Sequence, residues 1–151
     1  MTKGEIAKSL FEEGYNCAQS VVAAFCDEIG MSKTDALKLS SSFGGGMGRL
    51  REVCGAVSGM FMVAGAVKGY TSPTDDEAKK NHYALIQKMA KMFSDQCGSI
   101  VCRELLNLGN DSEGPAPTPR TEHFYKKRPC GEYVQLAADI TQKLIFEESV
   151  K

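Results

Sequence analysis

Four of the six cysteines in this chain fall where a helix is predicted to begin, and they give the sequence its clearest chemistry. The start of a helix offers unpaired backbone N–H groups and a partial positive charge, which favour a thiolate over a thiol. A thiolate binds metals and attacks disulfides, so the pattern predicts sulfur chemistry of one of these two kinds. The four residues are Cys17, Cys54, Cys102 and Cys130.

Arginines close to three of these cysteines would add positive potential around a sulfur anion if their side chains turn inward. They are Arg49 and Arg51 before Cys54, Arg103 after Cys102, and Arg128 before Cys130.

The other candidate ligands fit the predicted site less well. Cys26 lies deep in a predicted helix and Cys97 at a helix end, where the dipole disfavours a thiolate, so we place both outside the site. No Cys-x-x-Cys pair occurs, which excludes zinc-finger and thioredoxin-type motifs. His82 and His123 lack the spacing of helical metal sites. A free cysteine can also pack as a small apolar group, so a helical scaffold without sulfur chemistry is a further alternative.

Glycine gathers beside the predicted site in two places. Residues 44–48 lack the Gly-Lys-Ser/Thr ending of a phosphate loop and follow a predicted helix rather than a strand. We therefore predict that Gly45 and Gly46 donate N–H groups to sulfur or to an anionic cofactor. Gly55 and Gly59 lie four residues apart on one helix face, so a second helix can approach closely there.

The elements that must position these residues are helices. Apolar residues recur at helical spacing through most of the chain, and no convincing strand or internal repeat interrupts them. We predict an all-α fold, with residues 1–151 forming a single four-cysteine domain, a bundle of about six to seven helices. The helix starts are expected near Thr2, Asn16, Ser32, Glu52, Thr74, Ser99 and Pro129.

Residues 110–127 break the helical pattern with three prolines and little apolar material. Such a segment buries too little surface to order itself, so we expect it to lie over the bundle or to move. It leads directly to Cys130 and would control the position of that thiol.

Composition narrows the classes of function. A chain of 151 residues with 42% hydrophobic content can build one core without disulfides. Its net charge is −1 and its basic residues are scattered, which argues against nucleic-acid binding. Residues 53–67 are uncharged but fall short of the roughly 20 needed to cross a bilayer, so no membrane insertion is expected. The N-terminal residues lack the apolar run of a secretory signal, which favours a cytoplasmic protein.

Several segments combine into one recognisable pattern: Asn16-Cys17-Ala18, Gly44-Gly45-Gly46-Met47-Gly48, Cys54-Gly55-Ala56-Val57-Ser58-Gly59, Gly98-Ser99, Cys102-Arg103 and Cys130-Gly131. With them the chain resembles, over nearly its whole length, the C_GCAxxG_C_C family of bacteria and archaea. That family is named for a Cys-Gly-Ala-x-x-Gly motif among four recurrent cysteines and is described as redox-active. A similar helical domain occurs in split-Soret cytochromes, where haem and an iron–sulfur centre are present. The chain has no Cys-x-x-Cys-His, so the resemblance does not extend to covalent haem.

The leading hypothesis from the sequence is that Cys17, Cys54, Cys102 and Cys130 converge and bind a metal centre for electron transfer or redox sensing. Four thiolates suit zinc or an iron–sulfur cluster, and the family resemblance favours the cluster. The alternative is a thiol–disulfide oxidoreductase or sensor that uses a cysteine pair without metal. Both readings imply a redox partner protein and allow a homodimer, and neither decides whether the protein is an enzyme.

Overall fold

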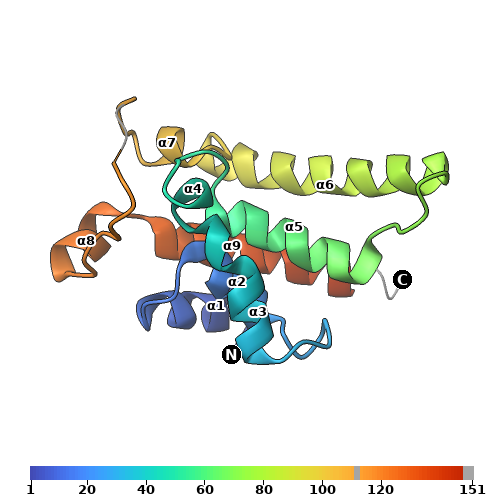
Figure 1. The fold of residues 1–151 in the computed structure, drawn as a ribbon, viewed down its shortest axis with the longest axis horizontal. Coiled ribbons are helices and arrows are strands. Elements are labelled where there is room, and N and C mark those ends of the chain that lie inside the picture. The colour runs from blue at the N-terminus through green and yellow to red at the C-terminus, as the bar shows by residue number, and fades with distance from the viewer. Residues whose placement is uncertain (111–112, 148–151) are drawn as a thin grey trace.

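The computed structural model describes residues 1–110 and 113–147 and shows them as a bundle of helices (Figure 1). No strand occurs among these residues, which confirms the predicted all-α class. Seven of the described α-helices have six or more residues, in agreement with the predicted number. The elements are α1 (Lys3–Glu12), α2 (Cys17–Ala24), α3 (Lys33–Ser40), the 3-10 turn η1 (Ser41–Phe43), α4 (Gly44–Met47), α5 (Gly55–Lys68), α6 (Asp76–Cys97), α7 (Cys102–Leu105), α8 (Glu122–Lys127), α9 (Cys130–Thr141) and the π-helical η2 (Gln142–Glu147).

The core lies where α5 and α9 run side by side through the middle of the bundle (Figure 1). α1 packs against α9, α2 packs against α5, and α6 covers α5 and α9 from the other side. α5 and α9 begin at the end of the molecule that also holds α4 and α7. The largest fully buried apolar side chains include Phe11, Phe25, Met60, Met89 and Phe93.

Side-chain caps fix several helix starts, some of them one residue from the predicted position. Thr2 and Glu5 form the predicted capping box at α1. At α6 the predicted cap Thr74 is wrong, because the carboxylate of Asp75 accepts a hydrogen bond from the Ala78 N–H at 3.0 Å. Aspartate caps a helix at least as well as threonine does, and here Asp75 rather than Thr74 is in the capping position.

α5 contains most of the uncharged segment, residues 53–67, and forms a core helix. Its residues Ala56, Val57, Met60, Val63 and Ala64 are all fully buried. No helix among the described residues is long and apolar enough to cross a bilayer.

The proline-rich segment after α7 is held to the bundle rather than left free. Arg120 donates hydrogen bonds to the carbonyl oxygens of Phe11 at 2.8 Å and Tyr15 at 2.9 Å, and its guanidinium lies 4.1 Å from the centre of the Phe11 ring. The segment also contains α8, which the sequence did not predict. The described part of the segment therefore lies over the bundle, which is one of the two expected outcomes, and Arg120 is one of its anchors. Residues 111–112 fall outside the described part of the chain.

Candidate functional site

All four cysteines of the predicted site lie at helix starts and line one inner cavity of about 30 Å³. Cys17, Cys102 and Cys130 are the first residues of α2, α7 and α9, and Cys54 is the residue that precedes α5. The predicted convergence is thus present, and the cavity is also lined by Gly45, Gly46 and Arg51. Cys26 and Cys97 do not line it.

Asn16 fixes the start of α2 and so the position of Cys17. Its side-chain oxygen accepts a hydrogen bond from the Gln19 N–H at 2.8 Å, and its own N–H donates to the Gln19 side chain at 3.1 Å. Its amide nitrogen donates to the carbonyl oxygen of Ser41 at 3.1 Å. One residue therefore caps α2 and ties Cys17 to η1.

Gly55 and Gly59 let α5 cross α2 at close range, as the sequence predicts. A Cβ at Gly55 would lie 3.1 Å from Cys17 Cβ and 2.9 Å from the carbonyl oxygen of Phe43. A Cβ at Gly59 would lie 3.0 Å from the carbonyl oxygen of Ala18. The absence of a Cβ at these positions lets the start of α5 approach the start of α2 closely.

A single antiparallel bridge between Val53 and Val101 sets Cys54 and Cys102 on neighbouring stretches of chain. The Cys102 N–H donates to the carbonyl oxygen of Glu52 at 2.6 Å, and the Cys54 N–H donates at 2.8 Å to the carbonyl oxygen of the residue before Val101. These bonds shorten the predicted helices at both places. The predicted starts near Glu52 and Ser99 are wrong because the backbone there pairs across the bridge.

The chain that enters this bridge winds through the left-handed region of backbone conformation. A residue with a Cβ is strained there by about 1–2 kcal/mol, whereas glycine is not. Gly46, with φ +69°, is required for a second reason, because a Cβ would lie 2.7 Å from Cys102 Cβ. The residues of this stretch with positive φ are Gly45, Gly46, Met47, Gly48, Arg49 and Arg51.

Arg51 links the site to the segment that follows α7. Its side chain is only 4% exposed and forms a two-pronged ion pair with Glu113, at 2.6 Å and 3.1 Å. Its remaining nitrogen donates to Cys102 Sγ at 3.6 Å. The hydrogen bond from Arg51 lowers the pKa of Glu113 below its usual value. Of the arginines expected to turn inward, Arg51 does so most completely.

The four thiols differ in how readily they ionise. Hydrogen bonding between Cys17 and Cys130 lowers the pKa of Cys130 and, with burial, raises the pKa of Cys17. Burial raises the pKa of Cys54 to about 12 and also raises that of Cys102, although Arg51 opposes the second shift. The pKa values of three of the four thiols thus shift against the expected preference for a thiolate, through the hydrogen bond with Cys130 at Cys17 and through burial at Cys54 and Cys102. Cys130 is the one site thiol whose pKa is lowered.

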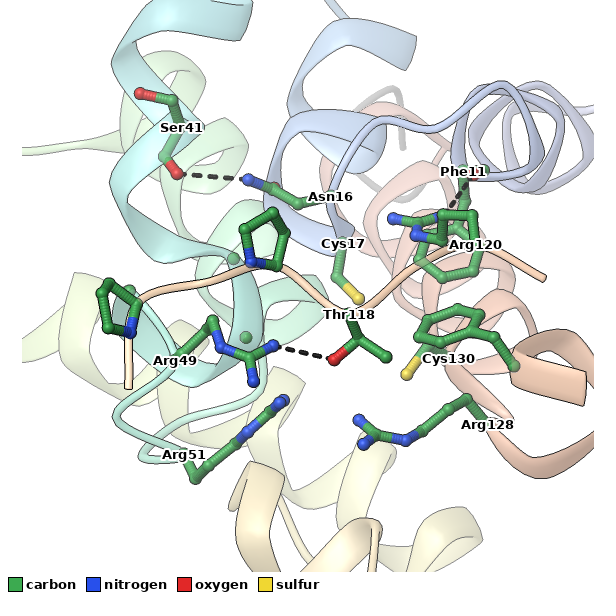
Figure 2. Close-up of a pocket in the computed structure, with 16 residues that line it drawn as sticks. Phe11, Asn16, Cys17, Ser41, Arg49, Arg51, Thr118, Arg120, Arg128 and Cys130 are labelled. Carbon is green, nitrogen blue, oxygen red and sulfur yellow. Dashed lines mark hydrogen bonds between the residues drawn. The ribbon is translucent and has the colours of Figure 1, made fainter. Parts of the chain in front are cut away.

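A second, larger pocket of about 300 Å³ opens beside the inner cavity and shares Cys17 and Cys130 with it. Figure 2 shows both sulfur atoms pointing into this pocket from different helices. Cys54 and Cys102 do not line it. The segment that carries Thr118 runs across it, and four arginines contribute to its wall: Arg49, Arg51, Arg120 and Arg128.

The donor set fits a single metal ion poorly as it stands. Within residues 1–110 and 113–147, no group of three or more His, Cys, Asp or Glu side chains is placed to hold one ion. Tetrahedral zinc, with Zn–S bonds of about 2.3 Å, needs its four sulfurs within roughly 3.8 Å of one another. An iron–sulfur cluster puts iron and sulfide between its cysteines, so its ligands lie further apart. The 30 Å³ cavity holds about one or two waters, and a cluster would require the cysteines to move outward.

Comparison with protein families agrees with the pattern of cysteines. Residues 15–144 match the family model described as "Putative redox-active protein (C_GCAxxG_C_C)". The chain belongs to this family. The match includes the four site cysteines of this C_GCAxxG_C_C protein and both glycine clusters. No curated protein and no solved structure matches the chain.

Three residues of the site gave no signal in the sequence. Glu113, Thr118 and Arg120 come from the segment expected to lack structure, yet they bind Arg51, Arg49 and α1. No local pattern marks them, because their partners lie far away along the chain.

Proposed function

We propose that this protein is a thiol–disulfide redox protein in which Cys17 and Cys130 cycle between a dithiol and a disulfide. One observation carries the proposal: of the four site cysteines, these two alone line the larger open pocket as well as the inner cavity. An external disulfide can therefore reach this pair, while Cys54 and Cys102 lie behind it.

The two thiols are unequal in a way that suits this chemistry. Cys130 attacks first, because hydrogen bonding from Cys17 and the positive charges of nearby arginines lower its pKa. The hydrogen bond with Cys130 and burial raise the pKa of Cys17, so Cys17 holds the proton of the pair until a substrate thiolate leaves.

In the first step the Cys130 thiolate bonds to one sulfur of the substrate disulfide, and the other substrate sulfur leaves as a thiolate. Cys17 gives up its proton, which that leaving thiolate takes. The Cys17 sulfur then attacks Cys130, forms the internal disulfide and releases the second substrate thiolate, which takes a proton from water. Overall the substrate gains two electrons and the protein loses two. A second dithiol, small enough to enter the pocket, reduces the internal disulfide and restores the dithiol.

The experiment counts electrons with the uncharged disulfide 4,4′-dithiodipyridine, which releases an absorbing thiol. The parent protein carries Cys26→Ser and Cys97→Ser, so the two partly exposed cysteines outside the site do not contribute. It should release two equivalents in its fast phase, whereas Cys17→Ala should stop at one and Cys130→Ala should lose the fast phase. Cys102→Ala is the matched control and should still release two. Two equivalents from Cys17→Ala would refute the proposed pair.

A second candidate is an iron–sulfur centre held by Cys17, Cys54, Cys102 and Cys130, for electron transfer to a protein partner or for redox sensing. It is supported by the shared inner cavity, which all four cysteines line at helix starts. Gly45 and Gly46, which line the same cavity, would donate backbone N–H groups to its sulfurs.

Anaerobic purification separates the two candidates. A bound cluster gives visible absorption and stoichiometric iron, and Cys54→Ser and Cys102→Ser would remove both signals. Colourless protein without iron from iron-supplemented cells would contradict this candidate. A homodimer stays a prediction, which sedimentation of the same preparation would check.

A further inference from the structure

The pocket that exposes Cys17 and Cys130 has an unbalanced positive charge. Its wall contains Arg49, Arg51, Arg120 and Arg128, and no Asp or Glu among the described residues lines it. The one carboxylate that pairs with these arginines in the described part of the chain is Glu113, which bridges Arg49 and Arg51. Several guanidinium charges thus face the pocket against a single neighbouring carboxylate.

Most of these guanidinium groups already have partners. Arg49 donates to the carbonyl oxygen of Gly114 at 3.1 Å and to Thr118 at 2.9 Å, and Arg51 is held by Glu113. Arg120 donates hydrogen bonds to the carbonyl oxygens of Phe11 in α1 and of Tyr15 just after α1.

Arg128 differs from the other three arginines. Its guanidinium makes no hydrogen bond or ion pair with another described residue and lies 5.7 Å from the centre of the Phe124 ring. Figure 2 shows its side chain extending toward the pocket, near Cys130. A guanidinium with open donors binds a carboxylate through two parallel hydrogen bonds.

We infer that this pocket binds a low-molecular-weight disulfide that carries carboxylate groups, with Arg128 as its anchor and its sulfurs against Cys17 and Cys130. The inference rests on the proposed dithiol function and names the substrate class. A volume of about 300 Å³ lies at the small end of ligand pockets and suits a small molecule. The segment across the pocket, pinned where Arg49 binds Thr118, hinders a folded protein from reaching the sulfurs.

The carboxylate contact orients the attack and changes none of its chemistry. With one carboxylate on Arg128, a substrate sulfur lies next to the Cys130 thiolate, and the bond changes are those of the exchange described above. The anchored half of the substrate leaves as an acidic thiol, and the other half follows when Cys17 closes the internal disulfide.

The test compares two disulfides of the same shape, the dianion dithiodiglycolate and the uncharged dithiodiglycolamide. Each rate constant for oxidation of the reduced protein is divided by that of the same disulfide with 2-mercaptoethanol, which removes intrinsic reactivity. We expect the normalised preference for the dianion to be about tenfold in the wild type and to be lost in Arg128→Gln, as for one charged hydrogen bond. Arg128→Lys should keep part of it. Lys127→Gln removes a charge one residue away, outside the pocket lining, and should change nothing.

A second measurement needs no variant and no reaction with disulfide. Thiodiglycolate, the unreactive thioether dianion, should slow alkylation of Cys130 by iodoacetamide in the wild type, and its diamide should not. Protection without oxidation by either disulfide would overturn the redox function and keep the anion site. Equal normalised oxidation by both disulfides, without protection, would overturn the anion site alone. A disulfide-linked acidic peptide that reacts faster than dithiodiglycolate would overturn the small-molecule assignment.

Discussion

Replacing Gly46 with alanine tests whether the left-handed stretch at residues 45–51 allows Cys102 to approach the other site cysteines. The added Cβ would lie 2.7 Å from Cys102 Cβ and 2.7 Å from Arg51 Cα. Neither atom is the free end of a flexible side chain, so the backbone must shift to relieve the contact. That shift moves Cys102 away from the other three sulfurs.

The magnitude has two parts, and Gly48 separates them. Both glycines have positive φ, +69° at Gly46 and +59° at Gly48, so alanine costs about 1–2 kcal/mol of backbone strain at either position. A Cβ at Gly48 meets nothing closer than 3.7 Å, so that variant should lose only this amount. Gly46→Ala adds overpacking of about 1–3 kcal/mol, for a total of roughly 2–5 kcal/mol.

Urea unfolding of the reduced proteins, followed by circular dichroism, measures both losses in the free energy of unfolding. The alkylation rate of Cys102, followed by the fluorescence of a maleimide label, shows whether this thiol becomes more accessible. We expect a faster rate in Gly46→Ala and an unchanged rate in Gly48→Ala. Equal destabilisation by Gly46→Ala and Gly48→Ala would refute the close approach. So would an unchanged alkylation rate in a strongly destabilised Gly46→Ala protein.

Two further outcomes follow from the same geometry. Gly59→Ala should destabilise the protein by about 1–3 kcal/mol because α2 lies against this residue. Gly65→Ala should stabilise the protein by about 0.5–1 kcal/mol because the space around Gly65 is open. Urea unfolding measures both changes, and the opposite order would contradict the close crossing of α5 and α2. Cys17→Ala removes the hydrogen bond that lowers the pKa of Cys130, so the pH midpoint of Cys130 alkylation should rise toward that of a free thiol. An unchanged or lower midpoint would contradict that role of Cys17.

The helices and the site cysteines could be predicted because local chemistry marks them. Asn16 is a strong cap, so Cys17 had to begin a helix. Gly55 and Gly59 at helical spacing indicated a close crossing, and the crossing partner is α2. Both signals need only residues within one turn of each other.

What the sequence could not predict depends on contacts between distant segments. The bridge between Val53 and Val101 has no hydrophobic period of its own, yet it shortens two predicted helices. The position of Glu113 follows from its ion pair with Arg51, 62 residues earlier in the chain. The differences in pKa among the four thiols have the same origin, because they depend on the burial of Cys54 and Cys102 and on the hydrogen bond between Cys17 and Cys130.

The most direct test of the central claim is to identify which cysteines oxidise first at equilibrium. Reduced wild-type protein is equilibrated anaerobically in dithiothreitol buffers of increasing potential, its free thiols are blocked at acid pH, and its disulfides are mapped by mass spectrometry. We expect one two-electron transition that joins Cys17 to Cys130, with Cys54 and Cys102 still blocked as thiols. A first disulfide between any other pair, or none up to fully oxidised dithiothreitol, would contradict it.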